Sequence, residues 1–116
     1  MESKTALQRL SALAQEGRLD AFRRLMVAGP QGLAAGDLAR ALAVPANTLS
    51  AQLAILAAAG LVGSHREGRS IIYCADYEAV GGLLRFLMED CCQGRAEVCG
   101  PLVELARFCC DRGAAE

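Results

Sequence analysis

The sequence predicts a mainly α-helical domain with one small β-hairpin, and three observations support this fold class. Residues 45–62, PANTLSAQLAILAAAGLV, repeat leucine at helical spacing, which places Leu49, Leu53 and Leu56 on one side of a helix. A shorter helix is predicted just before it, at residues 37–42, across a compact turn. Two short strand-like runs follow it. This order of elements indicates a winged helix-turn-helix fold.

The outward side of the longer helix has the composition of a surface that reads DNA. Asn47 is predicted to cap its start, and Gly60 to end it. The side chains opposite the leucines are small and uncharged, which suits close approach to base edges and thymine methyl groups. Gln52 can pair with adenine through two hydrogen bonds. The alternative is a helix that only packs against a protein. The residues of this helix predicted to contact DNA are Asn47, Thr48, Ser50, Ala51 and Gln52.

The hairpin after this helix is predicted to be the wing. Its strands are residues 61–64 and 70–75, and the turn between them, HREGR, places glycine where a positive φ is needed. Arg66 and Arg69 flank the Glu-Gly pair of that turn and are candidates for contacts to phosphates or to the minor groove. The alternative is that they are ordinary surface arginines. His65, the one histidine of the chain, is placed as a phosphate neighbour rather than a metal ligand.

Two more helices are predicted ahead of this unit. Residues 3–15 and 18–28 carry apolar side chains at helical spacing, with Gly17 between the two helices. Residues 31–36 are predicted to form a loop into the helix-turn-helix. Both helices can equally be plain core elements.

The last helix is predicted to begin at Asp76, which caps it, and to carry an apolar stripe. The stripe repeats at intervals of 3, 4, 3 and 4 residues, as in a coiled-coil contact between two helices. A helix-turn-helix protein must hold two recognition helices about one DNA turn apart, so the stripe predicts a homodimer. The alternative is a stripe that packs within one chain. Its members are Tyr77, Val80, Leu84, Leu87 and Cys91.

One long stretch of the chain resembles a known family. The run AGDLARALAVPANTLSAQLAILAAAGLVGSHREGRSIIY is similar to the ArsR/SmtB family of winged-helix repressors, most clearly in NTLSAQL, AAAGLV and REGRSIIY. The resemblance covers roughly residues 5–90 and implies that the first helix packs in a dimer interface while the second supports the helix-turn-helix. The chain departs from the family at Ala51, where members often carry histidine, and near Ala54, where they often carry lysine or arginine.

Composition and charge limit the classes of function. The 116 residues suffice for one domain, and 53% of them are hydrophobic, which is ample for a core shared with a partner. The formal net charge is −1, but residues 1–30 carry +2, residues 31–75 carry +1 and residues 76–116 carry −4. A DNA-binding face can therefore be locally basic. We expect a cytoplasmic protein that does not enter a membrane, because no long apolar run and no signal peptide are evident.

Three of the six cysteines form a group just past the apolar stripe. In a reducing compartment such clusters indicate metal or redox chemistry rather than disulfides. Cys91, Cys92 and Cys99, in CCQGRAEVC, have no histidine nearby, so they suit neither magnesium nor calcium and fall one ligand short of structural zinc. Three thiolates do suit a three-coordinate thiophilic ion such as As(III) or Sb(III). Neighbouring helical cysteines point about 100° apart, so binding should distort the helix end.

The family resemblance implies the same site, because some members bind arsenite through a vicinal cysteine pair that ends the last helix and a third cysteine a few residues later. We expect residues 1–90 to bind DNA and dimerise, and residues 91–116 to bind the effector. The expected function is a repressor released from double-stranded operator DNA by As(III) or Sb(III). Alternatives are buried free thiols, a redox-sensing dithiol, and a repressor that senses cadmium or lead. Cys74 is placed as a small core residue, and Cys109 and Cys110 stay unassigned.

A thiol enzyme is not predicted, and neither is an organic cofactor. Cys91 and Cys92 are followed by Arg95 at spacings of 4 and 3, so the C-x5-R loop of a phosphatase-like arsenate reductase is missing. No C-x-x-C pair occurs either.

Overall fold

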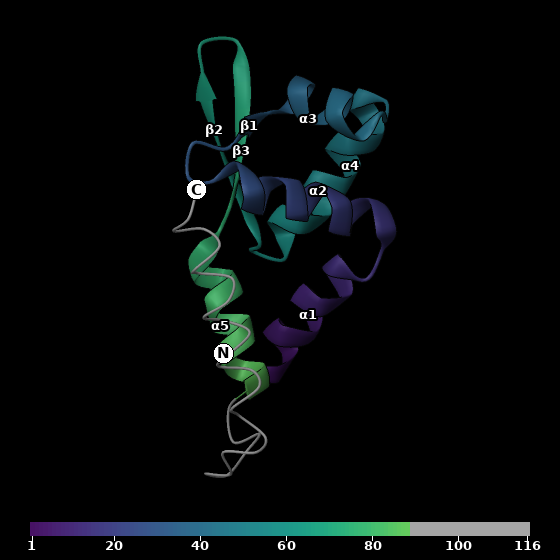
Figure 1. Ribbon diagram of the computed structural model, residues 1–116. Coiled ribbons are helices and arrows are strands. Elements are labelled where there is room, and N and C mark those ends of the chain that lie inside the picture. Colours follow the sequence, from purple (N-terminus) through teal and green to yellow (C-terminus); the bar gives the residue numbers. More distant parts are fainter. Residues whose placement is uncertain (89–116) are drawn as a thin grey trace. The chain divides into compact units, whose positions relative to one another are not determined.

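The computed structural model describes residues 1–88 of the chain (Figure 1). Residues 1–83 form one compact unit. The helices and strands, in chain order, are α1 (Ser3–Leu13), α2 (Glu16–Ala28), β1 (Leu33–Ala34), α3 (Ala35–Leu42), α4 (Ala46–Ala58), β2 (Val62–Glu67), β3 (Ser70–Ala75) and α5 (Tyr77–Met88). This confirms the predicted winged helix-turn-helix fold, in which α3 and α4 are the two helices of the motif and β2 with β3 is the wing. The predicted effector ligands Cys91, Cys92 and Cys99 lie outside the described residues, as do Cys109 and Cys110.

The core lies where α2, α3 and α4 pack together. Its largest fully buried side chains are all leucines, each less than 2% exposed: Leu25, Leu38, Leu49, Leu53, Leu56 and Leu61. The leucine stripe predicted for α4 is therefore confirmed, and it fixes which side of that helix remains outside.

The sheet has three antiparallel strands in the order β1-β3-β2. In the wing, Val62 pairs with Ala75 and the register continues to Glu67 opposite Ser70, so that the hairpin projects beyond the helices (Figure 1). β1 was predicted to be loop, and this was wrong, because Leu33 pairs with Tyr73 of β3. A strand of two residues is too short to show the period of two that identifies strands in a sequence.

The start of α4 differs from the prediction. Ala43 ends α3 in the left-handed conformation, with φ 56° and ψ 44°, and Pro45 then enters α4 in an extended conformation. Helix α4 begins at Ala46, so the cap position belongs to Pro45 and not to Asn47. Asn47 lies in the first turn, where its Oδ1 accepts a hydrogen bond from the N–H of Thr48 at 3.0 Å. The predicted end of the helix is confirmed, since Gly60 has φ +79° and Leu61 N–H donates back to the carbonyl of Leu56.

Gly17 lies inside α2 rather than between the first two helices. The helix begins at Glu16, and Gln15 precedes it as the capping residue, its Oε1 accepting from the N–H of Arg18 at 2.8 Å. The prediction placed the boundary at the glycine because glycine weakens helices. A glycine is tolerated at this position for two reasons. Gln15 caps the start of the helix, and the side chain of Gln52 occupies the space that a Cβ atom at residue 17 would need.

Asp76 caps α5, as predicted: its Oδ1 accepts the N–H of Ala79 at 3.0 Å. Replacing Asp76 with alanine should lower the free energy of unfolding by about 1 kcal/mol, because that N–H loses its partner. Asp76→Asn keeps a capping oxygen and should retain most of the stability. Urea denaturation of both variants measures the difference. Equal losses in the two would contradict a capping role.

The apolar stripe predicted on α5 is mostly exposed in the single chain. Tyr77 is 40% exposed, Leu84 53% and Leu87 49%. Val80 differs, because it is half-buried and packs against the core. The side chains of α5 that are buried are Ala79 and Leu83. No single helix among residues 1–88 is long and apolar enough to cross a membrane, and α3 with α4 reaches that length and hydropathy only as a pair bent by 109°.

Candidate nucleic-acid interface

The exposed side of α4 is the first part of the candidate interface. Asn47, Thr48, Ser50 and Ala51 are all exposed there, as predicted from their position opposite the leucines. Ile55 continues the same side one turn later and is 45% exposed. None of these side chains carries a charge, and the largest polar one is an amide. A helix with such a surface can approach a base edge closely because it brings no bulky or strongly hydrated group.

Gln52 lies apart from the other four residues predicted on α4. Its side chain is half-buried and turned toward α2, so close to Gly17 that a Cβ atom there would lie 2.1 Å from Gln52 Nε2. Its Oε1 is buried without a hydrogen-bond partner. The residue sits just before Leu53, at the edge of the leucine stripe, where helical spacing alone does not decide between inside and outside. In this structure Gln52 packs between α2 and α4 instead of joining the exposed face.

The wing is the second part of the interface. Arg66, on β2, lies opposite Ile71, and Arg69 follows Gly68, whose φ of +60° confirms the positive φ expected in the turn. Both arginines are exposed, and among residues 1–88 neither forms an ion pair. Their guanidinium groups are therefore free to meet phosphates. Arg69 also lines an open hollow of about 470 Å³ between the wing and the first turn of α3.

Arg40 lines the same hollow and was not singled out from the sequence. It forms an exposed ion pair with Asp37 one turn earlier in α3. The sequence shows only that the first helix of the motif carries one arginine. Arginines are so common on helix surfaces that this did not predict a contact with DNA.

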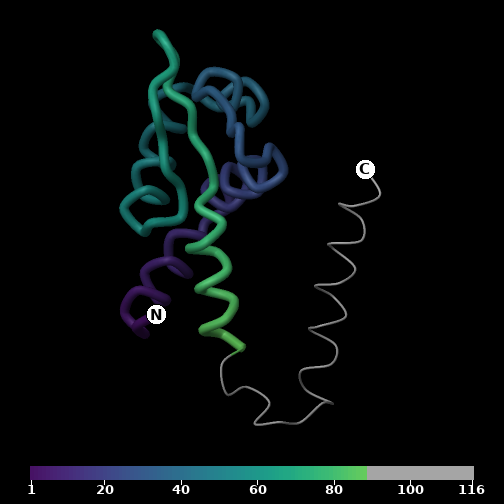
Figure 2. Tube along the Cα trace, turned by 90° about the vertical axis from the view of Figure 1, so that its left-hand side faces the viewer, coloured from purple at the N-terminus to yellow at the C-terminus, as the bar shows by residue number. Residues whose placement is uncertain are grey.

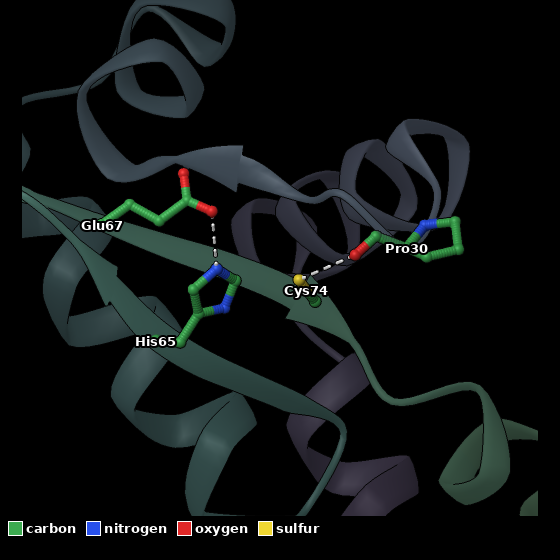
Figure 3. A network of polar contacts seen from close by, with 4 residues as sticks. All are labelled: Pro30, His65, Glu67 and Cys74. Carbon is green, nitrogen blue, oxygen red and sulfur yellow. Dashed lines mark hydrogen bonds and ion pairs between the residues drawn. The ribbon is translucent and has the colours of Figure 1, made fainter.

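His65 and Cys74 take minor parts in the wing (Figure 3). His65 Nε2 lies 3.2 Å from Glu67 Oε1, and both side chains are more than half exposed, so the pair contributes little to stability. Cys74 was predicted to be a small core residue. The structure places it half-buried on β3, with its Sγ donating to the carbonyl of Pro30 at 3.4 Å. Within residues 1–88, no three side chains of the kinds that bind metals come together.

Comparison with known proteins agrees with this geometry. A helix-turn-helix domain family matches residues 8–64, which include both helices of the motif. The transcriptional regulator HlyU from Vibrio vulnificus CMCP6 is 31% identical to this chain. The match covers 78% of this chain and 91% of HlyU, with a TM-score of 0.56. The chain is a winged helix-turn-helix transcriptional regulator of the ArsR/HlyU type.

Solved structures of ArsR-like regulators extend the match. An ArsR-like transcriptional regulator from Rhodococcus sp. RHA1 is 27% identical, with 90% of this chain and 92% of that one covered and a TM-score of 0.66. The homodimeric winged helix-turn-helix DNA-binding domain of Mb0332 from Mycobacterium bovis, a possible ArsR-family regulator, is 26% identical over 75% of this chain and 81% of its own, with a TM-score of 0.60. Among curated proteins, none matches. As a protein of the ArsR/HlyU type, the chain is a DNA-binding transcriptional regulator.

Proposed function

We propose that the protein is a homodimeric repressor that leaves its operator when As(III) or Sb(III) binds Cys91, Cys92 and Cys99. Two observations carry the DNA-binding part: the face of α4 is small and uncharged, and the two wing arginines are exposed and form no ion pair within residues 1–88. The face of α4 would enter the major groove, and Arg66 and Arg69 would hold the adjacent backbone.

Dimerisation would hold two such faces at the spacing that an operator requires. The exposed apolar side chains of α5, Tyr77, Leu84 and Leu87, suit a contact with a second copy, because an isolated chain gains little by leaving them in water. The M. bovis relative is described as homodimeric, which supports the same assembly here.

The effector part of the proposal rests on the chemistry of the cysteines. A trivalent arsenic or antimony ion bonds to three thiolates, so the two neighbouring cysteines and Cys99 together complete its coordination. Drawing them together would reshape the chain just beyond α5 and change the relation of the two recognition helices. A tenfold loss of DNA affinity requires the ion to favour the released form by only about 1.4 kcal/mol.

The test is a titration of fluorescently labelled operator DNA, taken from upstream of the protein's own coding region, with the native chain. Binding is followed by anisotropy with and without arsenite. We expect a tight complex that a stoichiometric amount of arsenite dissolves. If cadmium, lead or peroxide releases the DNA and arsenite does not, the arsenite assignment is wrong and the protein senses those metals or oxidants instead. Failure to bind any DNA from that region would reject the repressor itself.

The wing arginines should set the salt dependence of DNA binding. Replacing Arg66 and Arg69 together with alanine should weaken operator binding by about tenfold at moderate salt, and should lower the slope of log K against log salt by about 0.9 for each lost phosphate contact. Anisotropy titrations at several salt concentrations measure both quantities. Arg23→Ala is the control, since Arg23 is also exposed but lines a hollow between α2 and α3. An equal effect of that control would assign the loss to net charge alone.

A further inference from the structure

Arg9 of α1 joins two helices that are far apart in the sequence. Its Nε donates to the carbonyl of Ala59 at 3.0 Å, and its Nη1 donates to the carbonyl of Ala79 at 3.4 Å, both in partly buried positions. Ala59 is the residue that caps the C-terminal end of α4, and Ala79 lies in the first turn of α5. One guanidinium group therefore contacts the end of the recognition helix and the beginning of the helix that leads toward the cysteines.

The surroundings of Arg9 explain why it is held there. The last carbonyls of a helix lack partners within the helix and carry a partial negative charge, so a cation is favourable at this end. Gln8, the residue before, donates from Nε2 to the carbonyl of Ala58 at 3.3 Å. Gly60 leaves room for the arginine, because a Cβ atom there would lie 3.1 Å from Arg9 Nη2. The two side chains together fasten α1 to the C-terminal end of α4.

A second link closes the same junction. The N–H of Asp76, the cap of α5, donates to the carbonyl of Leu61 at 2.8 Å, directly after the turn that ends α4. In Figure 2, α1 and the start of α5 both lie below the wing. The junction thus consists of main-chain groups of α4 and α5, held by one main-chain hydrogen bond and by the planar fork of one arginine.

We infer that Arg9 is a positioning residue that sets the angle of the recognition helix relative to α5, so that a change in α5 reaches the DNA-reading face. The guanidinium can do this because its donors point in fixed directions and satisfy two carbonyls at once, whereas a lysine ammonium on a flexible stem does not fix their separation. Loss of Arg9 would loosen the C-terminal end of α4, so that its angle varies and DNA would have to select one angle from several. The inference rests on the proposed function in that DNA binding is its readout.

The test compares Arg9→Ala and Arg9→Lys with the native chain and with Arg18→Ala. Arg18 is a matched control because it also donates to helix-end carbonyls, of Ala12 at 2.7 Å and Ser11 at 3.4 Å, but these belong to α1. We expect Arg9→Ala to weaken operator binding in the absence of effector by about tenfold, while Arg18→Ala changes it by less than about twofold. Amide hydrogen exchange at Gly60 and Leu61 should speed up in Arg9→Ala and stay native in Arg18→Ala.

Two further readouts separate positioning from a direct phosphate contact and from a loss of folding. A positioning residue leaves the salt slope of DNA binding unchanged, whereas a lost phosphate contact lowers it by about 0.9. Arg9→Lys keeps the charge and should still bind weakly. All titrations are made at a temperature where circular dichroism shows each variant folded. Native affinity in Arg9→Ala, full recovery in Arg9→Lys, or an equal loss in Arg18→Ala would overturn the inference.

The effector arm adds a distinct outcome. If arsenite releases the native chain, the ratio of operator affinities without and with arsenite should fall toward one in Arg9→Ala, because the side-chain link from α5 to the end of α4 is lost and only the main-chain hydrogen bond of Asp76 remains. An unchanged ratio would overturn the transmission through Arg9. If arsenite leaves the native chain on DNA, the proposed effector fails. The comparison of the effector-free variants then still decides the role of Arg9 in setting α4.

Discussion

Replacing Cys92 with serine is expected to abolish the response to arsenite while leaving operator binding without effector at the native level. A hydroxyl is a poor ligand for As(III) compared with a thiolate, so the ion would lose one of three bonds and with it the drive to reshape the chain beyond α5. The measurement is the arsenite concentration that releases labelled operator from each variant. We expect Cys91→Ser and Cys99→Ser to behave alike, with any residual release requiring arsenite far above the native range.

Cys74→Ser is the matched control for the loss of a thiol. Cys74 lies on β3, and a serine hydroxyl can keep the hydrogen bond to the carbonyl of Pro30. This variant should bind operator and respond to arsenite as the native chain does. A native response in Cys92→Ser would contradict the proposed ligand set, and a lost response in Cys74→Ser would move the site to the wing.

Replacing Gly32 with alanine should have the largest effect on stability. Gly32 has φ +71°, and a Cβ atom there would lie 2.2 Å from the main-chain oxygen of Tyr73 and 2.6 Å from Cys74 Sγ. The main chain of β3 cannot yield without breaking the pairing of Leu33 with Tyr73. Backbone strain and steric overlap together should cost on the order of 3 kcal/mol or more. Urea denaturation followed by circular dichroism measures the loss.

Gly63→Ala provides the comparison for this stability effect. Gly63 lies on β2 at an ordinary φ, with no atom within 4 Å of the position its Cβ would take. Its replacement should therefore change the free energy of unfolding by less than about 0.5 kcal/mol. A small effect at Gly32 as well would mean that β1 can detach from the sheet at little cost.

The helical repeat of apolar residues and the residues that begin or end a helix were predictable, because each depends on a few neighbouring residues in the sequence. The leucines of α4 follow helical spacing and are all buried, Gly60 ends that helix with a positive φ, and Asp76 caps α5. The short strand β1 was missed because its two residues are defined only by their partner strand. Asn47 was taken for a cap because side-chain preference favours it, whereas Pro45 has the required extended conformation.

The candidate interface divides in the same way. The exposed residues of α4 and both wing arginines could be placed from periodicity and turn chemistry alone. The position of Gln52 could not, because its inward rotation depends on the absence of a side chain at Gly17, on another helix. Arg9 was missed for the same reason: its two acceptors lie 50 and 70 residues away in the sequence. Nothing in the residues around Arg9 on α1 indicates that the end of α4 is its partner.

The central proposal, that three sulfurs act as the trigger, is tested most directly by X-ray absorption at the arsenic edge on the stoichiometric complex of the native chain with arsenite. We expect three sulfur neighbours around each arsenic atom, and fewer in the variant that carries serine at Cys91, Cys92 and Cys99. A shell of oxygen neighbours in the native complex, or a sulfur count that the triple substitution leaves unchanged, would contradict the proposed site.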